Sequence, residues 1–177
     1  MTDTDTDTTT TEDDGSKLLD VYLRDHLAGA HAGLALAERC RRSNDGTPLA
    51  VLLDGIIAEI AEDRDSLRQI MDRLDVTENK LKSIAGRAAE AIGRVKSNGT
   101  LTHYSPSSRV VELEGLLAGV DAKRNLWASL RTIADERPEL DPAQLDALIQ
   151  RATSQRERLL PAHHDAALVA FSATRTA

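Results

Sequence analysis

Four side chains of this sequence are of the types that bind a divalent metal between helices. His26 and His163 carry imidazoles, and Asp63 and Glu114 carry carboxylates. Such a set suits iron or manganese in a helical bundle. The usual spacing for these sites is Glu-x-x-His on one helix, and no histidine of this sequence has a glutamate three residues before it. The sequence therefore favours buried polar pairs over a metal site.

Asp63 is distinctive because it falls on the apolar side of a long amphipathic pattern. Within residues 49–74, leucine, isoleucine and methionine recur at the spacing of one helix face, and Asp63 follows Ile60 on that face. A buried carboxylate is costly unless a partner compensates it. A turn at residues 43–48 would bring His26 of the preceding helix level with Asp63. We therefore expect His26 and Asp63 to be partners.

Two more acid–base pairs follow from a turn near residues 137–139. Folding the chain back at that turn brings Asp121 level with Arg156, and Glu114 level with His163. We predict an interior ion pair between Asp121 and Arg156. Buried pairs of this kind can fix the register of packed helices without adding stability. An arginine in the interior also competes with a metal for the acids.

Helices must position all these residues, because apolar residues recur at helical spacing through most of the chain. Thr47 with Pro48, and Asp141 with Pro142, are signals for a helix start. Pro161 is expected to kink or break the last helix. The pattern predicts an all-α, up-and-down bundle of four long helices plus one shorter helix. They are expected over residues 17–42, 49–74, 80–96 (the shorter one), 108–135 and from 142 on.

The composition of the chain indicates its domain organisation and limits the classes of partner that it could bind. We expect an acidic Thr/Asp tail at residues 1–16 to be disordered, residues 17–172 to form one bundle domain, and residues 173–177 to be flexible. A net charge of −7 and few aromatic residues argue against binding to nucleic acid or to an anionic membrane. We expect a cytoplasmic protein, because no apolar stretch reaches transmembrane length and no signal-peptide pattern is present.

No complete catalytic motif occurs in the sequence. Cys40 is the single cysteine, so no intrachain disulfide is possible. It is expected to project away from the apolar stripe, where nearby arginines would lower its pKa, but no histidine lies beside it in sequence. Gly29 and Gly33 weaken the first helix, which suggests that another helix backbone packs close to them.

The segment Tyr22–Ala30, YLRDHLAGA, the acids Glu59, Glu62 and Asp63, and a late hairpin bearing Glu114 and His163 together resemble the ferritin-like superfamily. More narrowly, they resemble uncharacterised bacterial members with a degenerate or absent di-metal motif. The resemblance covers roughly residues 18–171 and implies an antiparallel helical bundle. Members of the superfamily include iron-storage proteins, di-iron oxidases and proteins that have lost the metal.

Three functional classes remain open from the sequence. The leading one is a non-enzymatic structural or partner-binding bundle that forms a homo-oligomer or binds another protein. The alternative is a metal-binding oxidoreductase or storage protein that uses iron or manganese at His26, Asp63, Glu114 and His163. A third class, a binder of small molecules or anions, would need a pocket around Arg124 and Arg156.

Overall fold

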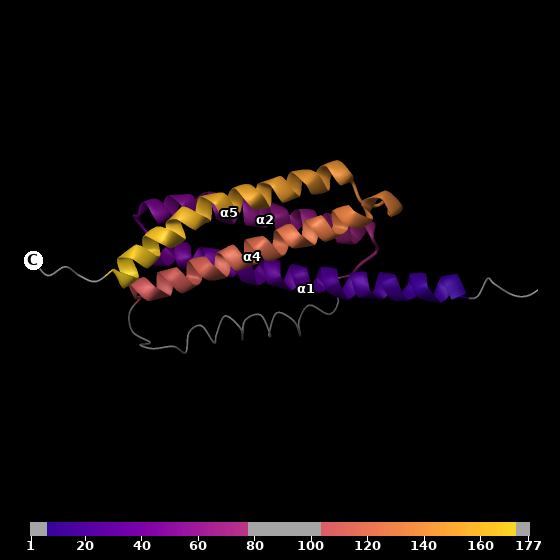
Figure 1. The fold of residues 1–177 in the computed structure, drawn as a ribbon, viewed down its shortest axis with the longest axis horizontal. Coiled ribbons are helices and arrows are strands. Elements are labelled where there is room, and N and C mark those ends of the chain that lie inside the picture. The colour runs from indigo at the N-terminus through magenta and orange to yellow at the C-terminus, as the bar shows by residue number, and fades with distance from the viewer. Residues whose placement is uncertain (1–6, 78–103, 173–177) are drawn as a thin grey trace, which may run out of the picture.

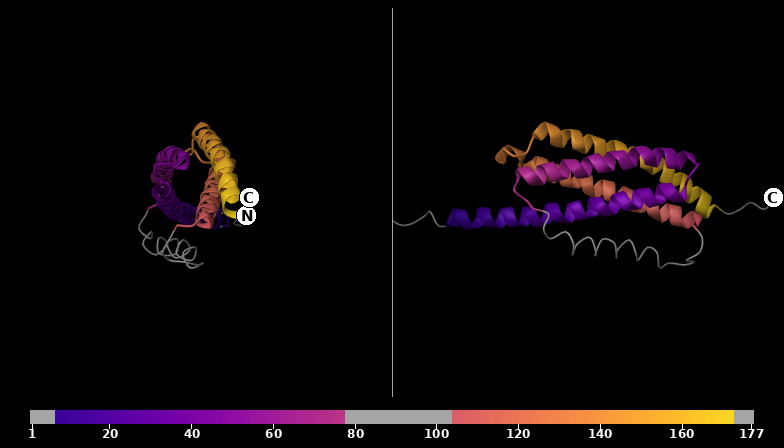
Figure 2. Two further views of the ribbon diagram at one scale, coloured as in Figure 1. Left: turned by 90° about the vertical axis from the view of Figure 1, so that its left-hand side faces the viewer. Right: turned by 180° about the vertical axis from the view of Figure 1, so that it is seen from behind.

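The computed structural model describes residues 7–77 and 104–172, with side chains from residue 14 onward. These residues form four long α-helices and one 3-10 turn. Their bounds are α1 (Asp7–Ser43), α2 (Pro48–Arg73), α4 (Pro106–Ile133), η1 (Ala134–Glu136) and α5 (Pro142–Phe171). The helices run alternately up and down and lie side by side (Figures 1 and 2). The predicted all-α class and the four long helices are therefore confirmed.

The structure differs from the sequence-based expectation at the start of α1. This helix begins at Asp7, so residues 7–16, which we expected to be disordered, are helical. Extending a helix that is already nucleated costs little per residue. Figure 1 shows the first part of α1 projecting past the ends of the other helices. The shorter helix predicted at 80–96 and the flexible terminus predicted at 173–177 lie outside the described residues.

The predicted capping signals are present at the helix starts. The hydroxyl of Thr47 accepts a hydrogen bond from the amide of Ala50 (3.4 Å), and the carboxylate of Asp141 accepts one from the amide of Ala143 (2.9 Å). Ser105 caps α4 in the same way. α5 continues through Pro161 to Phe171 without a break. None of the helices in the described ranges is long and apolar enough to cross a membrane.

The core consists of two hydrophobic clusters that meet near the middle of the bundle. The cluster that we call the Trp127 half contains Leu23, Leu27, Leu67, Ile70, Met71, Val76, Leu126, Trp127, Leu130, Ala134, Leu140, Leu145 and Leu148. The Cys40 half contains Ala37, Cys40, Leu53, Ile56, Ile60, Val110, Leu113, Leu116, Val120, Ala152, Leu159 and Ala166. In α2 and α4 the boundary between the two halves falls at Asp63 and Lys123.

Candidate functional site

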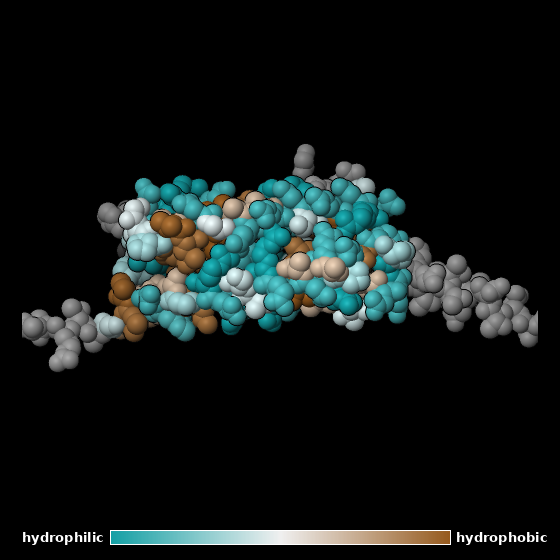
Figure 3. All heavy atoms as spheres, turned by 90° about the horizontal axis from the view of Figure 1, so that it is seen from above, coloured by the Kyte–Doolittle hydropathy of each residue, from teal (hydrophilic) through white to brown (hydrophobic). Residues whose placement is uncertain are grey.

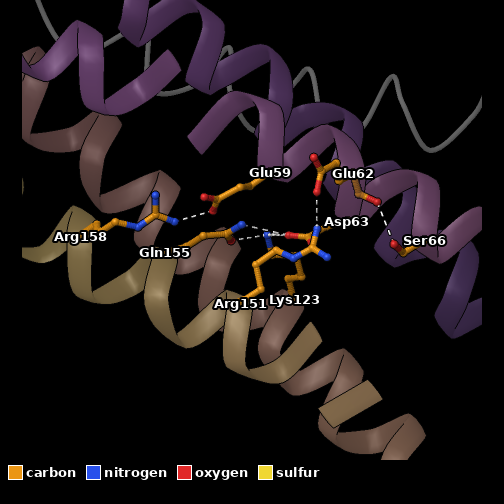
Figure 4. A network of polar contacts seen from close by, with 8 residues as sticks. All are labelled: Glu59, Glu62, Asp63, Ser66, Lys123, Arg151, Gln155 and Arg158. Atoms are coloured by element: carbon orange, nitrogen blue, oxygen red, sulfur yellow. Dashed lines mark hydrogen bonds and ion pairs between the residues drawn. The ribbon is translucent and has the colours of Figure 1, made fainter. Parts of the chain in front are cut away.

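The candidate site is a polar network centred on Asp63, at the boundary between the two core halves (Figure 4). Asp63 of α2 is only 1% exposed. Its Oδ2 atom accepts hydrogen bonds from Lys123 Nζ of α4 (2.5 Å) and from Gln155 Nε2 of α5 (3.1 Å). Lys123 Nζ also donates to Gln155 Oε1 (2.5 Å). Three helices therefore contribute one side chain each to a closed triangle of hydrogen bonds.

Two arginines of α5 extend the network along α2. Arg151 Nη1 lies 3.3 Å from Asp63 Oδ1 and 2.9 Å from Glu62 Oε2, although Asp63 Oδ1 accepts no hydrogen bond in the network. One turn away, Arg158 Nη2 donates to Glu59 Oε2 (2.5 Å). The acids of α2 thus face the cations of α5, as Figure 4 shows. This arrangement neutralises the acids and joins two helices that otherwise touch little.

Burial and pairing have opposite effects on the pKa values of two partly buried groups of the network, Lys123 and Glu59. Burial lowers the pKa of Lys123 because it disfavours the ammonium ion, and Asp63 and Glu59 offset only part of that effect. Burial alone would raise the pKa of Glu59. Hydrogen bonds from Arg158 and Gln155, together with the charges of Arg158 and Arg151, outweigh it and leave that pKa below its ordinary value.

A cavity of about 110 Å³ lies beside the network, between α1, α2 and α4. Asp63, Lys123 and His26 contribute to its wall, and the rest is mainly glycine, alanine and large apolar side chains. Trp127 also lines it, and its buried indole N–H has no hydrogen-bond partner among the described residues. Arg124 and Arg156 do not line this cavity. It is therefore not the pocket around these two arginines that a binder of small molecules or anions would need.

The expected partnership of His26 with Asp63 is wrong. Both residues line the same cavity, but the imidazole packs edge-on against Tyr22, with ring centroids 4.5 Å apart. Burial lowers the pKa of His26, and the nearby Asp25 offsets this only in part. The partners of Asp63 are instead Lys123, Gln155 and Arg151. A lysine can reach this carboxylate from α4 because its side chain is long and flexible.

The two pairs predicted between α4 and α5 both form. His163 Nε2 lies 3.3 Å from Glu114 Oε1, and Arg156 Nε lies 3.2 Å from Asp121 Oδ1. The predicted register is therefore confirmed, but the description of Asp121–Arg156 as interior is wrong. Their side chains are 42% and 41% exposed, because the buried face of α5 passes through Gln155 instead of Arg156.

The four candidate metal ligands do not form one site. Glu114 and His163 pair at the surface of the α4–α5 hairpin, Asp63 belongs to the central network, and His26 packs on Tyr22. Among the residues that the structure describes, no three histidine, cysteine, aspartate or glutamate side chains come together in a way that could hold a metal ion.

Sequence reasoning missed Lys123 and Gln155, although their spacing contained a signal. Lys123 lies between Val120 and Trp127 on the apolar side of α4, and Gln155 lies between Ala152 and Leu159 on the apolar side of α5. Each is thus a polar residue inside an apolar stripe, as Asp63 is in α2. Searching every helix for such exceptions would have found all three.

A second polar cluster lies at the end of the bundle where α1 ends and α4 begins. Glu112 accepts a hydrogen bond from Tyr104 (3.0 Å) and pairs with Arg39 (2.9 Å), and Asn44 donates to Tyr104 (2.9 Å) and to the carbonyl of Cys40 (2.7 Å). Cys40 is fully buried here, contrary to our expectation. Burial and the nearby Glu112 raise the pKa of its thiol to about 12, so it is not an activated nucleophile.

The two buried acids of the described interior, Asp63 and Glu112, are therefore each paired with a basic side chain. Their chemistry is that of register-setting pairs between helices. Comparison of the chain with protein-family models, with curated proteins and with solved structures found no match. The resemblance to the ferritin-like superfamily stays a prediction.

Proposed function

We propose that this protein is a non-enzymatic helical bundle that associates with a second copy of itself through one apolar end. The observation that carries this proposal is the exposure of large apolar side chains where α5 ends. Leu168, Val169 and Phe171 are 65%, 67% and 67% exposed. Val51, in the first turn of α2, is also exposed. Figure 1 shows that α2 begins at the end of the bundle where α5 ends. We call these four residues the α5-end surface.

The hydrophobic colouring of the molecule agrees with this choice of surface. Figure 3 shows brown side chains gathered toward the end of the bundle where α5 ends and α2 begins. Exposed apolar patches that exceed a few isolated residues mark interaction sites in soluble proteins. A twofold contact would place the same patch on both sides of the interface and would remove it from water in both copies.

The interior supports a structural role over catalysis. The buried acid of the central network is held by a lysine, a glutamine and an arginine, and the acid of the second cluster is held by a tyrosine and an arginine. Breaking either set would leave a buried charge without a partner, which is costly. Buried acids that are held by such partners stabilise one arrangement of the helices.

The experiment is size-exclusion chromatography with light scattering over a range of protein concentrations. The unchanged protein is expected to have the mass of two chains. The double variant Leu168→Ser/Val169→Ser is expected to have the mass of one chain, because two apolar side chains leave the interface. Leu18→Ser/Val21→Ser is the matched control, since both of its residues are exposed on α1 away from this end.

A mass of one chain for the unchanged protein at every concentration would overturn the proposal. So would a dimer that survives the α5-end substitutions but dissociates in the α1 control. Circular dichroism of each variant establishes that the helices are retained, so that a change in mass reports association and not unfolding.

A further inference from the structure

The cavity beside the Asp63 network has a largely apolar wall and a polar end on α4. Its volume is about 110 Å³. Trp127 and Lys123 both line it and lie four residues apart, so their side chains project from the same face of α4. The large apolar side chains of the wall are Ile60, Leu67, Leu116, Val120 and Leu126. Small molecules bind in cavities of this kind, where a few polar groups fix the orientation of an apolar body.

Trp127 supplies a hydrogen-bond donor that no described residue satisfies. The residue is 1% exposed, and its indole N–H is buried without an acceptor among the described residues. A buried donor without an acceptor is costly and uncommon in native proteins, and phenylalanine would fill much of the same space without that cost. An acceptor inside the cavity would remove the cost.

Lys123 supplies a second donor one helical turn away. Its Nζ atom donates to Asp63 Oδ2 and to Gln155 Oε1 (both 2.5 Å). An ammonium ion carries three N–H groups, so one of them has no acceptor among the described residues. Burial lowers the pKa of Lys123 because the ammonium ion is poorly solvated here, and a further acceptor would stabilise the ion.

We propose that this cavity binds a small neutral molecule with an apolar body and one carbonyl oxygen. The oxygen accepts a hydrogen bond from the indole N–H of Trp127, and the remaining N–H of Lys123 is a second donor for it. A carbonyl oxygen can accept two hydrogen bonds and brings no donor of its own. A hydroxyl group would bring a proton that needs another acceptor. The apolar body lies against the leucine, isoleucine and valine side chains of the wall.

The charges around the cavity favour a neutral ligand over an anion. The network has three acids and three cations that pair with one another: Glu59, Glu62, Asp63, Lys123, Arg151 and Arg158. Arg64 also lines the cavity, but it pairs with Asp65 (2.9 Å). Burial lowers the pKa of His26, which keeps this lining residue neutral at pH 7. An anion would lose its hydration here without meeting a net positive charge.

The volume limits the size of the ligand. A cavity of roughly 150 Å³ accommodates benzene, so this cavity suits a molecule of about six or seven non-hydrogen atoms. Small cyclic or short-chain carbonyl compounds have this size and the required single acceptor. Cyclohexanone is a suitable probe. Methylenecyclohexane is the matched control ligand, because a CH₂ group replaces the carbonyl oxygen and the shape is otherwise nearly the same.

NMR titration of the full chain labelled with ¹⁵N tests the proposal directly. Trp127 is the only tryptophan, so the spectrum contains one indole N–H signal. Cyclohexanone is expected to shift this signal downfield in a saturable way, because the N–H gains a hydrogen bond. Methylenecyclohexane is expected to cause no downfield shift of this signal, even where it fills the same space.

The variant Trp127→Phe tests whether the donor selects the carbonyl. Its affinity for cyclohexanone, measured by ligand-detected NMR, is expected to fall by about five- to tenfold, as the loss of one hydrogen bond predicts. Its affinity for methylenecyclohexane should not fall by this factor. Tyr104→Phe is the matched control variant, since it also removes a polar hydrogen from an aromatic side chain but does not line the cavity. It should bind both probes as the unchanged protein does.

Each other outcome would overturn the proposal. Equal affinity of the unchanged protein and Trp127→Phe for cyclohexanone would show that the indole N–H does not bind the oxygen. An equal loss for both probes would show that the substitution changed only the shape of the cavity. If cyclohexanone does not bind to the unchanged protein up to its solubility limit, the cavity does not take such a ligand.

A substitution that fills the cavity provides a second test, which does not alter Trp127. Ala30 of α1 lines the cavity, and Ala30→Leu is expected to reduce the binding of cyclohexanone by about tenfold or more, because the leucine takes up much of the volume. Ala32→Leu is the control on the same helix, since Ala32 does not line the cavity. Circular dichroism establishes that both variants keep their helices. Unchanged binding to a folded Ala30→Leu variant would place the ligand elsewhere and would also overturn the proposal.

Discussion

The two halves of the core are held together by different means. The Trp127 half is built from large apolar side chains, and none of the four buried polar residues of the described structure belongs to it. The Cys40 half contains three alanines and ends in the cluster of Asn44, Glu112 and Tyr104. The network of Asp63 lies where the two halves meet.

This contrast shows two ways of specifying one helix arrangement. Large side chains define a packing by their shapes, because interiors are close-packed and misfits are costly. Alanines let helices approach but define their register poorly, so hydrogen bonds must supply the specificity there. The cluster around Glu112 fulfils that role within the Cys40 half, and the network around Asp63 fulfils it at the boundary between the halves.

Removing the acid at the boundary should have the largest effect on both halves. Asp63→Ala leaves Lys123 buried without its anionic partner, and we expect it to lower the free energy of unfolding by about 3–5 kcal/mol. Urea denaturation followed by circular dichroism measures the change. The double variant Asp63→Leu/Lys123→Met should recover most of the loss, because apolar residues of similar volume replace the pair. A loss in the double variant as large as in the single variant would contradict this explanation.

Truncation of a side chain in the Trp127 half should lower stability only through the loss of apolar packing. Leu130 is fully buried in this half, and Leu130→Ala should lower the free energy of unfolding by about 2–5 kcal/mol. The loss should not depend on pH between 6 and 8, because no titratable group changes its surroundings. Repeating the urea titrations at both pH values checks this, and a strong pH dependence would show that this half also relies on buried charges.

Truncation of a side chain in the polar cluster of Asn44, Glu112 and Tyr104 should lower stability through the loss of hydrogen bonds. Asn44→Ala removes the donor to Tyr104 and to the carbonyl of Cys40, and we expect a loss of about 1–3 kcal/mol in the free energy of unfolding. Asn44→Asp, which keeps the shape but not the amide donor, should lose at least as much. If the aspartate variant were as stable as the unchanged protein, shape and not hydrogen bonding would specify this half.

The Cys40 half should also be the more sensitive to alkali. The pKa of Cys40 is raised to about 12 by burial and by Glu112, so in the folded state the thiol keeps its proton over a range where the unfolded chain loses it. This contribution to stability is present below about pH 8.5, the ordinary thiol pKa, and is lost as the pH rises towards 12. Cys40→Ala should flatten the fall in stability over that window. An unchanged slope would show that the thiol does not titrate with unfolding.

The smallest effect is expected at the exposed pair between α4 and α5. Asp121→Asn should change the free energy of unfolding by at most about 1 kcal/mol, because both partners are more than one-third exposed and solvent screens them. Measurement in low and high salt separates the ionic part of this contribution. A loss comparable to that of Asp63→Ala would mean that this pair also acts as a register-setting contact.

Sequence periodicity predicted the four long helices, and local motifs predicted the caps of α2 and α5, because these features are local; the Ser105 cap of α4 was not predicted. The Thr47 and Asp141 caps depend on residues within a few positions of each other, and the α4–α5 register depends on one turn. The burial of Asp63 was predicted for the same reason, because its position within the apolar stripe of a single helix is enough to indicate burial.

The partners of Asp63 were not predicted because they depend on the relative rotation of three helices. A change in phase of one residue, about 100° on a helix, exchanges Gln155 for Arg156 on the buried face of α5. Side-chain reach adds a further ambiguity, since Lys123 reaches a carboxylate on a neighbouring helix. The helical start of α1 was missed because composition predicts disorder without considering the stable helix that follows.

The two halves of the core each contain an intrinsic probe. Trp127 is the only tryptophan of the chain and Cys40 the only cysteine, and both are buried. Fluorescence of the unmodified protein therefore follows solvent entry into one half, while the rate of thiol labelling follows opening of the other. If both signals change at one denaturant concentration, the bundle unfolds as one cooperative unit across its polar boundary. If thiol labelling begins first, the Cys40 half opens as a separate unit.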